Sequence, residues 1–423
     1  MQPNQELQTA ASHFQAGRLD EAETACRSVI EQQPGMTDAV HLLALVSRKQ
    51  GKLDEAESLF KACLEKRRDR ADIHANYGNL LRASGRTEEA IAEYHKALDI
   101  DSLFQPARIA LARAFISSGH YTHALAEAKM LLEQDDADAE AWAACGTAHR
   151  GMDDLGEAET AYRKAIELKP GYGAAHHDLG ALLSKESRHE EALVELMHAG
   201  QAGVKGPEMV FNLASTLAGL TKFDEAEELL YEATKAIPQG VDLHRLLARL
   251  RFMRGDDDWD SIIRATATNL PEFTPLRIAH SQLLHAAGEF DKAYEVLDSF
   301  TDEQLEDKMV QAELSAVHQE AGRYEEALEA ARKVAAGEEG YGEYIDLLID
   351  PLMSLGRADE AMPLIELARE AVPLNQWYVA MEATGARLLG DPRYEELYDY
   401  ERFVQPYVIE TPPGWSSIEE FRR

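Results

Sequence analysis

The sequence predicts an all-α fold, a solenoid of about eleven repeated helical hairpins. Three observations predict it. A turn position recurs every 34 residues along most of the 423-residue chain. A small residue follows five positions after that turn, and a proline closes several of the units. A fixed period of this length is the signature of stacked repeats, each of which buries its apolar faces only against its neighbours.

The turn position is mostly glycine, which adopts left-handed backbone without steric cost. The period continues where the glycine is replaced, and one step, between the eighth and ninth positions, is 33 residues instead of 34. Each unit therefore contains two helical segments separated by a tight turn. The twelve turn positions are Gly17, Gly51, Gly85, Gly119, Asp153, Ser187, Thr221, Gly255, Gly288, Gly322, Gly356 and Gly390.

The segment after each turn has the pattern of a helix that packs closely against its partner. In the third unit Ala90, Tyr94, Ala97 and Leu98 recur at helical spacing. Alanine five residues after the turn lets two backbones approach, and Asp260 is the exception to this rule. The alanines are Ala22, Ala56, Ala90, Ala124, Ala158, Ala192, Ala226, Ala293, Ala327 and Ala361; the closing prolines are Pro34, Pro170, Pro238, Pro271 and Pro373.

The charge balance excludes some classes of partner. The chain has 76 acidic and 43 basic residues, for a formal net charge of −33. Binding to nucleic acid depends on neutralising phosphates with Lys and Arg, so a nucleic-acid partner is not expected. An anionic membrane surface is disfavoured for the same reason, and a basic partner is favoured.

The sequence contains few features that indicate the cellular compartment of the protein. The opening residues lack a basic start and an apolar run, and no stretch approaches the roughly 18 apolar residues of a membrane span. Three cysteines without a CxxC motif do not indicate a disulfide framework. We therefore expect a cytoplasmic location, with Cys26, Cys63 and Cys145 as small apolar core residues.

No motif predicts catalysis, a cofactor or a metal site. A His-x-Asp pair can ligate non-haem iron. His176 and Asp178 lie on a predicted helix, however, where their side chains point about 200° apart and cannot share one metal ion. His120 and His123 share a helix face without carboxylate or cysteine partners beside them. Phosphate-binding loops, nucleophile elbows and zinc-protease motifs are missing from the sequence. We therefore expect no enzyme activity from this chain.

The repeat resembles the tetratricopeptide repeat (TPR) family, whose period is also 34 residues. The resemblance covers residues 3–390 and implies a right-handed superhelix in which the first helix of each unit lines a concave groove. The eighth unit, "GDDDWDSIIRATATNLP", departs most, although Trp259 and Ile263 are expected to face the core. The matching residues are Trp142, Cys145, Gly146, Ala158, Tyr162, Ala165 and Pro170 in the fifth unit, and Tyr77, Gly78, Ala90, Tyr94 and Ala97 in the third.

The first helices supply a candidate binding surface. Acidic runs begin the second helices, where they complement the helix dipole, whereas arginines and asparagines recur along the first helices. Arginine matches carboxylates and asparagine can bind a peptide backbone, so we expect an extended or acidic polypeptide as partner. Alternatively, the arginines pair with acidic residues of neighbouring repeats. The groove candidates are Arg48, Asn76, Asn79, Arg82, Arg113, Arg150, Asn212, Arg245 and Arg249.

The end of the chain differs from the repeats. We expect a capping helix over residues 391–404 and an extended tail, or the start of a further domain, over 405–423. The stretches "DPRYEELYDYERFVQPY" and "PPGWSSIEEF" resemble the junction of bacterial proteins that join TPRs to a 2-oxoglutarate/Fe(II) oxygenase domain. That resemblance implies an alternative function, the substrate-recruiting region of a modifying enzyme; an O-linked glycosyltransferase is a weaker alternative. An uncovered solenoid end would favour homo-oligomers.

Overall fold

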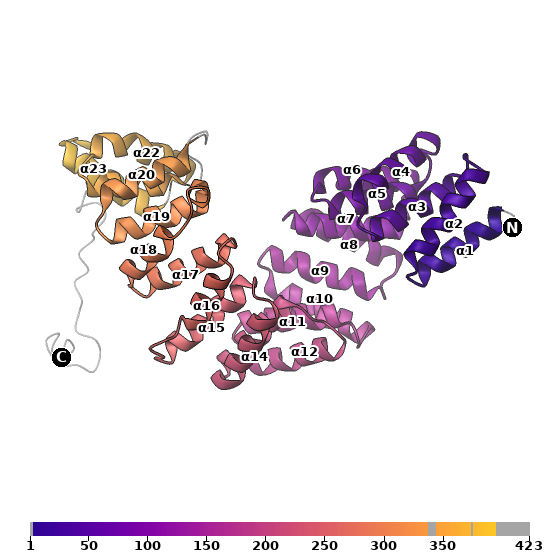
Figure 1. Cartoon of the computed structure of the whole chain (residues 1–423), viewed down its shortest axis with the longest axis horizontal. Coiled ribbons are helices and arrows are strands. Elements are labelled where there is room, and N and C mark those ends of the chain that lie inside the picture. Colours follow the sequence, from indigo (N-terminus) through magenta and orange to yellow (C-terminus); the bar gives the residue numbers. More distant parts are fainter. Residues whose placement is uncertain (1–2, 337–343, 374, 395–423) are drawn as a thin grey trace, which may run out of the picture. The chain divides into compact units, whose positions relative to one another are not determined.

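The computed structural model describes residues 3–336, 344–373 and 375–394. Within these ranges the chain forms 23 α-helices and one short 3-10 helix, and it contains no strand. The all-α prediction is confirmed. The chain divides into two compact units, residues 1–229 and 230–423, with the boundary inside helix α14. Figure 1 shows the helices following one another as antiparallel neighbours within each unit.

In the first unit, each odd-numbered first helix from α1 to α11 packs against the even-numbered second helix after it. Each second helix from α2 to α12 also contacts the next first helix. The helices are α1 (Pro3–Gln15), α2 (Leu19–Gln32), α3 (Thr37–Lys49), α4 (Leu53–Lys66), α5 (Ala71–Ala83), α6 (Thr87–Ile100), α7 (Gln105–Ser117), α8 (Tyr121–Gln134), α9 (Ala139–Gly151), α10 (Leu155–Leu168), α11 (Gly173–Lys185), α12 (His189–Gln201), α13 (Pro207–Gly219) and α14 (Phe223–Ala236).

The second unit continues the same alternation with two shortened second helices, α16 and α18. A 3-10 helix, η1, follows α18 and contacts α19. The helices are α15 (Val241–Met253), α16 (Ser261–Asn269), α17 (Thr274–Ala286), α18 (Phe290–Asp298), η1 (Gln304–Glu306), α19 (Lys308–Glu320), α20 (Tyr324–Ala335), α21 (Ile345–Ser354), α22 (Ala358–Ala371) and α23 (Gln376–Leu389).

The turn positions all have left-handed backbone, as the 34-residue period predicts. The nine glycines among them have φ between 67° and 79°. Asp153, Ser187 and Thr221 adopt the same conformation, with φ of 62°, 62° and 60°. A β-branched side chain rarely adopts this backbone, so the repeat geometry imposes it on Thr221.

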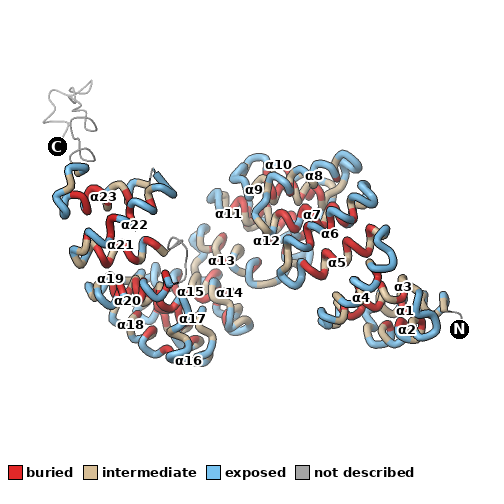
Figure 2. The backbone as a smooth tube through the Cα atoms, turned by 90° about the horizontal axis from the view of Figure 1, so that it is seen from above, coloured by how far each residue is buried: buried red, intermediate tan, exposed pale blue. Residues whose placement is uncertain are grey.

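The core runs between the helices of each hairpin and of successive hairpins. Figure 2 shows buried residues along the helix sides that face other helices, and exposed residues in the turns. The alanines five residues after the turns are fully buried. Tyr94 and Tyr162 are the largest fully buried side chains, and each lies over a glycine of its first helix, Gly78 or Gly146. The three cysteines are buried and free, as expected.

The eighth repeat keeps its core although its sequence departs from the pattern. Trp259 and Ile263 are both buried, which confirms their expected placement. Asp260 occupies the usual alanine position and is buried as well. Its carboxylate lies 2.7 Å from His280 Nε2 and accepts from Arg264 Nη1 at 3.0 Å. The buried carboxylate is therefore hydrogen-bonded, as burial requires.

The expected capping helix over 391–404 lies largely outside the described residues, and the tail 405–423 lies wholly outside them. Both stay predictions, together with the resemblance to an oxygenase junction. At the last described residues, Arg393 bonds Asp391 and Glu366 of α22. In the part of the chain that the structure describes, no helix has the length and apolarity to cross a membrane.

Candidate functional site

The nine groove candidates all lie on first helices, at the fifth, sixth, ninth or twelfth helix position, which we call the first-helix face. Positions five, nine and twelve fall on one side of a helix, and position six is adjacent to it. Seven of the nine lie in the first unit, on α3, α5, α7, α9 and α13. Arg245 and Arg249 lie on α15 in the second unit.

Two asparagines of this face are bonded to histidines of the preceding repeat. Asn76 Nδ2 lies 3.2 Å from His41 Nε2, and Asn212 Nδ2 lies 3.0 Å from His177 Nε2. In both pairs the residues are 35 positions apart. Burial lowers the pKa of His41, which favours the neutral ring that accepts this hydrogen bond. The spacing of His at position five and Asn at position six of the next repeat is the signal in the sequence that could have predicted these bonds.

Three of the arginines contact an acceptor on the next first helix. Arg113 is paired with Glu140, and Arg150 lies 3.9 Å from Asp178. Arg245 donates to Gln282. For Arg113 and Arg150 the structure agrees with the alternative that the arginines pair with neighbouring repeats. Arg249 is exposed and has no hydrogen-bond or ion-pair partner among the described residues.

Arg48 and Arg82 differ from Arg113 and Arg150 because neither has a carboxylate partner in the described part of the chain. Arg48 is half-buried, and burial lowers its pKa, with the nearby Arg82 charge acting in the same direction. The hydroxyl of Tyr94 donates to Asn79 Oδ1 at 3.0 Å. Burial raises the pKa of Tyr94, and a hydrogen bond with Arg82 opposes that rise. We call Arg48, Asn79, Arg82 and Tyr94 the Arg48–Arg82 cluster.

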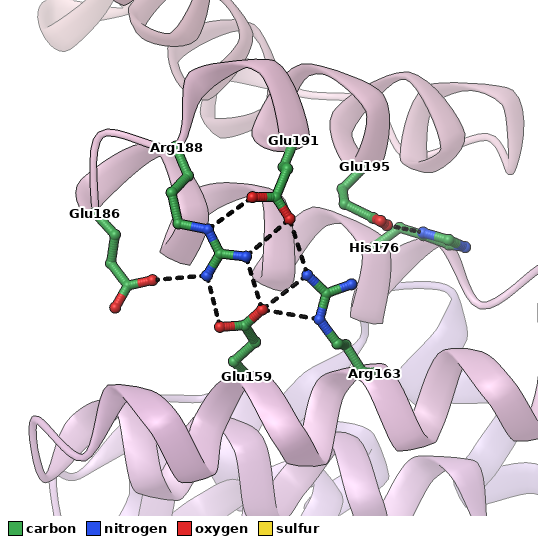
Figure 3. Close-up of polar contacts among 7 residues, drawn as sticks. All are labelled: Glu159, Arg163, His176, Glu186, Arg188, Glu191 and Glu195. Atoms are coloured by element: carbon green, nitrogen blue, oxygen red, sulfur yellow. Dashed lines mark hydrogen bonds and ion pairs between the residues drawn. The ribbon is translucent and has the colours of Figure 1, made fainter.

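Carboxylates of the second helices are occupied elsewhere. Figure 3 shows Arg188 between Glu159 of the preceding repeat and Glu191 of α12, the helix that Arg188 directly precedes, with bonds of 2.7–3.0 Å. Arg163 bonds Glu159 and Glu191, and Glu186 lies 3.4 Å from Arg188. The acidic runs thus bridge successive repeats, in addition to complementing the helix dipoles.

Residues with potential catalytic chemistry have structural contacts instead. His176 lies 2.6 Å from Glu195 and 3.0 Å from the carbonyl oxygen of Pro170. Burial raises the pKa of Cys26, Cys63 and Cys145 to about 11, which keeps these thiols protonated and unreactive at neutral pH. Across the described ranges, no three His, Cys, Asp or Glu side chains are grouped to hold a metal ion.

Comparison with known proteins supports the repeat family. The model of the cilia and flagella-associated protein 70 C-terminal domain matches residues 65–269, and two tetratricopeptide repeat models match residues 13–80 and 309–333. No curated protein matches the chain.

Two solved structures illustrate the likeness, and one of them, yeast Tom70, agrees in fold at low identity. Yeast Tom70 is 12% identical, with 95% of this chain and 99% of that chain covered and a TM-score of 0.50. A tetratricopeptide repeat protein from Parabacteroides merdae ATCC 43184 is 16% identical, with 57% and 98% covered and a TM-score of 0.49. The period, the left-handed turns, the family models and the Tom70 fold agree that the chain is a tetratricopeptide repeat protein.

Proposed function

We propose that the chain is a protein-interaction scaffold that binds an extended acidic polypeptide on the first-helix face of the first unit, at the Arg48–Arg82 cluster. The observation that carries this proposal is the lack of a carboxylate beside two neighbouring arginines in a chain of net charge −33. Elsewhere on the first-helix face of the first unit, Arg113 and Arg150 are paired within the chain. The TPR fold generally presents such surfaces to protein partners.

Physical chemistry favours an acidic partner at this cluster. Burying a cation without a counter-charge is unfavourable, so a carboxylate arriving from outside would gain more at Arg48 than at an arginine already paired. Arginine can also bind a carboxylate with two parallel hydrogen bonds. The hydroxyl of the buried Tyr94 donates to Asn79 and fixes the orientation of that amide in the cluster.

The test is to select peptides from a random phage-displayed library on the full chain and to measure their affinity by fluorescence anisotropy. We expect Asp- and Glu-rich sequences. The double variant R48Q/R82Q should weaken binding by roughly tenfold or more, because charged hydrogen bonds are each worth about 1.5–3 kcal/mol. The control R27Q/R163Q removes the same charge from exposed second-helix positions of the same unit.

The control should change the affinity by less than about threefold, because exposed charges contribute little and are screened by salt. Equal losses in the two double variants would mean that net charge alone governs binding, and the proposed site would be wrong. Selection of neutral or basic peptides would also contradict the proposal. Circular dichroism of both variants establishes that the helices are intact.

A further inference from the structure

In each of six first helices, one side chain forms a hydrogen bond to the backbone of the loop that precedes the helix. The residue at the fourth position donates to the backbone carbonyl six residues before it, at 2.6–3.2 Å. The family motif has tryptophan here, and this chain uses four residue types for the same bond. The six donors are His74, Arg108, Trp142, His176, Arg277 and Gln311.

Where this donor can carry a positive charge, a glutamate usually stands 19 residues later. His74 lies 2.6 Å from Glu93, and His176 lies 2.6 Å from Glu195. Arg108, which is 4% exposed, is paired with Glu127 at 2.5 Å. The glutamate lies on the second helix of the same repeat and neutralises the donor inside the protein, as a buried charge requires.

Arg277 breaks this rule. It is 8% exposed, yet the residue 19 positions later is Val296. Its Nη1 donates to Gln304 Oε1 at 3.1 Å and its Nη2 to Ser299 Oγ at 2.6 Å, both neutral acceptors. No carboxylate forms an ion pair with it among the described residues, although Glu272 attracts it from farther away. Burial accordingly lowers the pKa of Arg277.

The uncompensated guanidinium lines a cleft of about 380 Å³ between α16, α17 and the segment from α18 to η1. Arg264, another lining residue, is paired with Asp258 and Asp260, and His280 is bonded to Asp260. The charge of Arg264 is therefore compensated by these carboxylates. Phe300 stacks on the guanidinium of Arg277, and 3.8 Å separates the guanidinium carbon Cζ from the centre of the phenyl ring. Among the residues that line the cleft, Glu272 is the one with an acidic side chain.

The hydrogen-bond inventory of Arg277 leaves one edge available. A guanidinium has five N–H donors. Two on Nη1 reach Pro271 O and Gln304 Oε1, and one on Nη2 reaches Ser299 Oγ. Neither the Nε–H nor the other Nη2–H has a hydrogen-bond partner among the described residues, and Nε and Nη2 together form one edge of the guanidinium. That edge matches the spacing of two oxygens of a carboxylate or a phosphate.

We propose that this cleft binds a small oxyanion, a carboxylate or phosphate group, through Nε and Nη2 of Arg277. The bound group would supply the negative charge that Glu127 supplies to Arg108, at a different edge of the guanidinium. The proposal is independent of the peptide surface in the first unit, because it rests on other residues in the second unit.

The experiment measures binding of inorganic phosphate, acetate and N-acetyl-phosphoserine amide to the full chain by isothermal titration calorimetry at constant ionic strength. We expect saturable binding at one site for at least one of these anions. Binding of phosphate or acetate would indicate a free anion as ligand, whereas binding of the phosphoserine derivative alone would indicate a modified side chain. If none of the three binds saturably, the proposal is wrong.

Two variants test the assignment to Arg277. V296E installs the partner that the equivalent arginine has in the fourth repeat, so it should compete with the anion and weaken binding by roughly tenfold or more while preserving the fold. R277Q should do the same by removing the donors. R332Q, which removes an exposed cation of α20, is the matched charge control and should retain binding. Undiminished binding by folded V296E would overturn the proposal even if R277Q fails to fold.

Discussion

Arg188 and Glu159 belong to successive repeats and are joined by two hydrogen bonds of 2.7 and 3.0 Å (Figure 3). Arg86 and Glu57 form the same pair at 2.9 and 3.0 Å, also 29 residues apart. The side chains of Lys61 and Arg86 hold the pKa of Glu57 down at about 2. This paired geometry places an ion-pair bridge between neighbouring second helices at the same site of two different repeats.

We expect the Arg188–Glu159 bridge to stabilise the interface between its two repeats. A double-mutant cycle of R188Q and E159Q, measured by urea unfolding, should give a coupling energy of about 1 kcal/mol, the upper end for solvent-accessible pairs, because two parallel bonds fix the geometry. The coupling should decrease as salt is raised.

The pair Lys164 and Glu167 provides the comparison. It lies within α10, is more exposed, and has a single contact of 3.0 Å. The cycle of K164Q and E167Q should give no more than about 0.5 kcal/mol. A coupling energy for Arg188 and Glu159 no larger than this value would show that the bridge between repeats stabilises the protein no more than an ion pair within one helix.

Gly78 should resist substitution because of a specific contact. A Cβ at this position would lie 2.6 Å from Cε1 of the fully buried Tyr94. G78A should therefore destabilise the protein by about 1–3 kcal/mol, the range for overpacked cores. Thermal unfolding measures the difference directly.

Gly156 is the matched helical glycine. It lies in the first turn of α10, and a Cβ there would meet nothing within 4 Å. G156A should stabilise the protein by up to about 1 kcal/mol, because alanine loses less backbone entropy on folding. A G78A variant as stable as G156A would disprove the steric account.

Replacing Thr221 with glycine should increase the stability of the protein. Its φ of 60° is costly for a β-branched residue, and most of the other turn positions have glycine. T221G should raise stability by about 1 kcal/mol in urea unfolding. The same substitution at the exposed helical residue Thr160 should lower stability by about 0.5 kcal/mol. A loss of stability in both variants would contradict the strain argument.

Acidification below neutral pH should destabilise the fold. Burial lowers the pKa of His41, His244, His280 and His318 from the ordinary 6.5. Below pH 6.5 the unfolded chain therefore binds more protons than the folded one, and stability falls as the pH falls, by up to about 1.4 kcal/mol per pH unit for each histidine.

Thermal unfolding at pH 7.5, 6.5 and 5.5 tests this expectation. Burial also raises the pKa of Glu313 and of Asp350, which makes stability fall as pH rises above the ordinary values of 4.5 and 3.8, so the histidine effect is measured against that opposing trend. In H318Q, which removes a ring whose Nδ1 is buried without a hydrogen bond, the decline towards pH 5.5 should be less steep. A melting temperature that rises on acidification would exclude the prediction.

Most of the fold could be predicted from the sequence because it depends on local and periodic features. The repeating step, 34 residues with one step of 33, locates the twelve turn positions, including Ser187 and Thr221, where the residue type alone indicates no left-handed backbone. Burial of the small residue after each turn follows from the same period. Stacked repeats depend on contacts with nearest neighbours, so a pattern within one unit is enough to specify them.

The candidate site could be predicted only in part. The sequence by itself determined that arginines and asparagines recur on first helices, because helical spacing assigns each residue to a face. Only the tertiary structure decided which of them have partners: Arg113 meets Glu140, whereas Arg48 meets no carboxylate in the described residues. It likewise separated Arg108 from Arg277, which occupy the same repeat position. The physical reason is that a long side chain can reach several neighbours, and burial together with the distance to a specific counter-charge determines which contact forms.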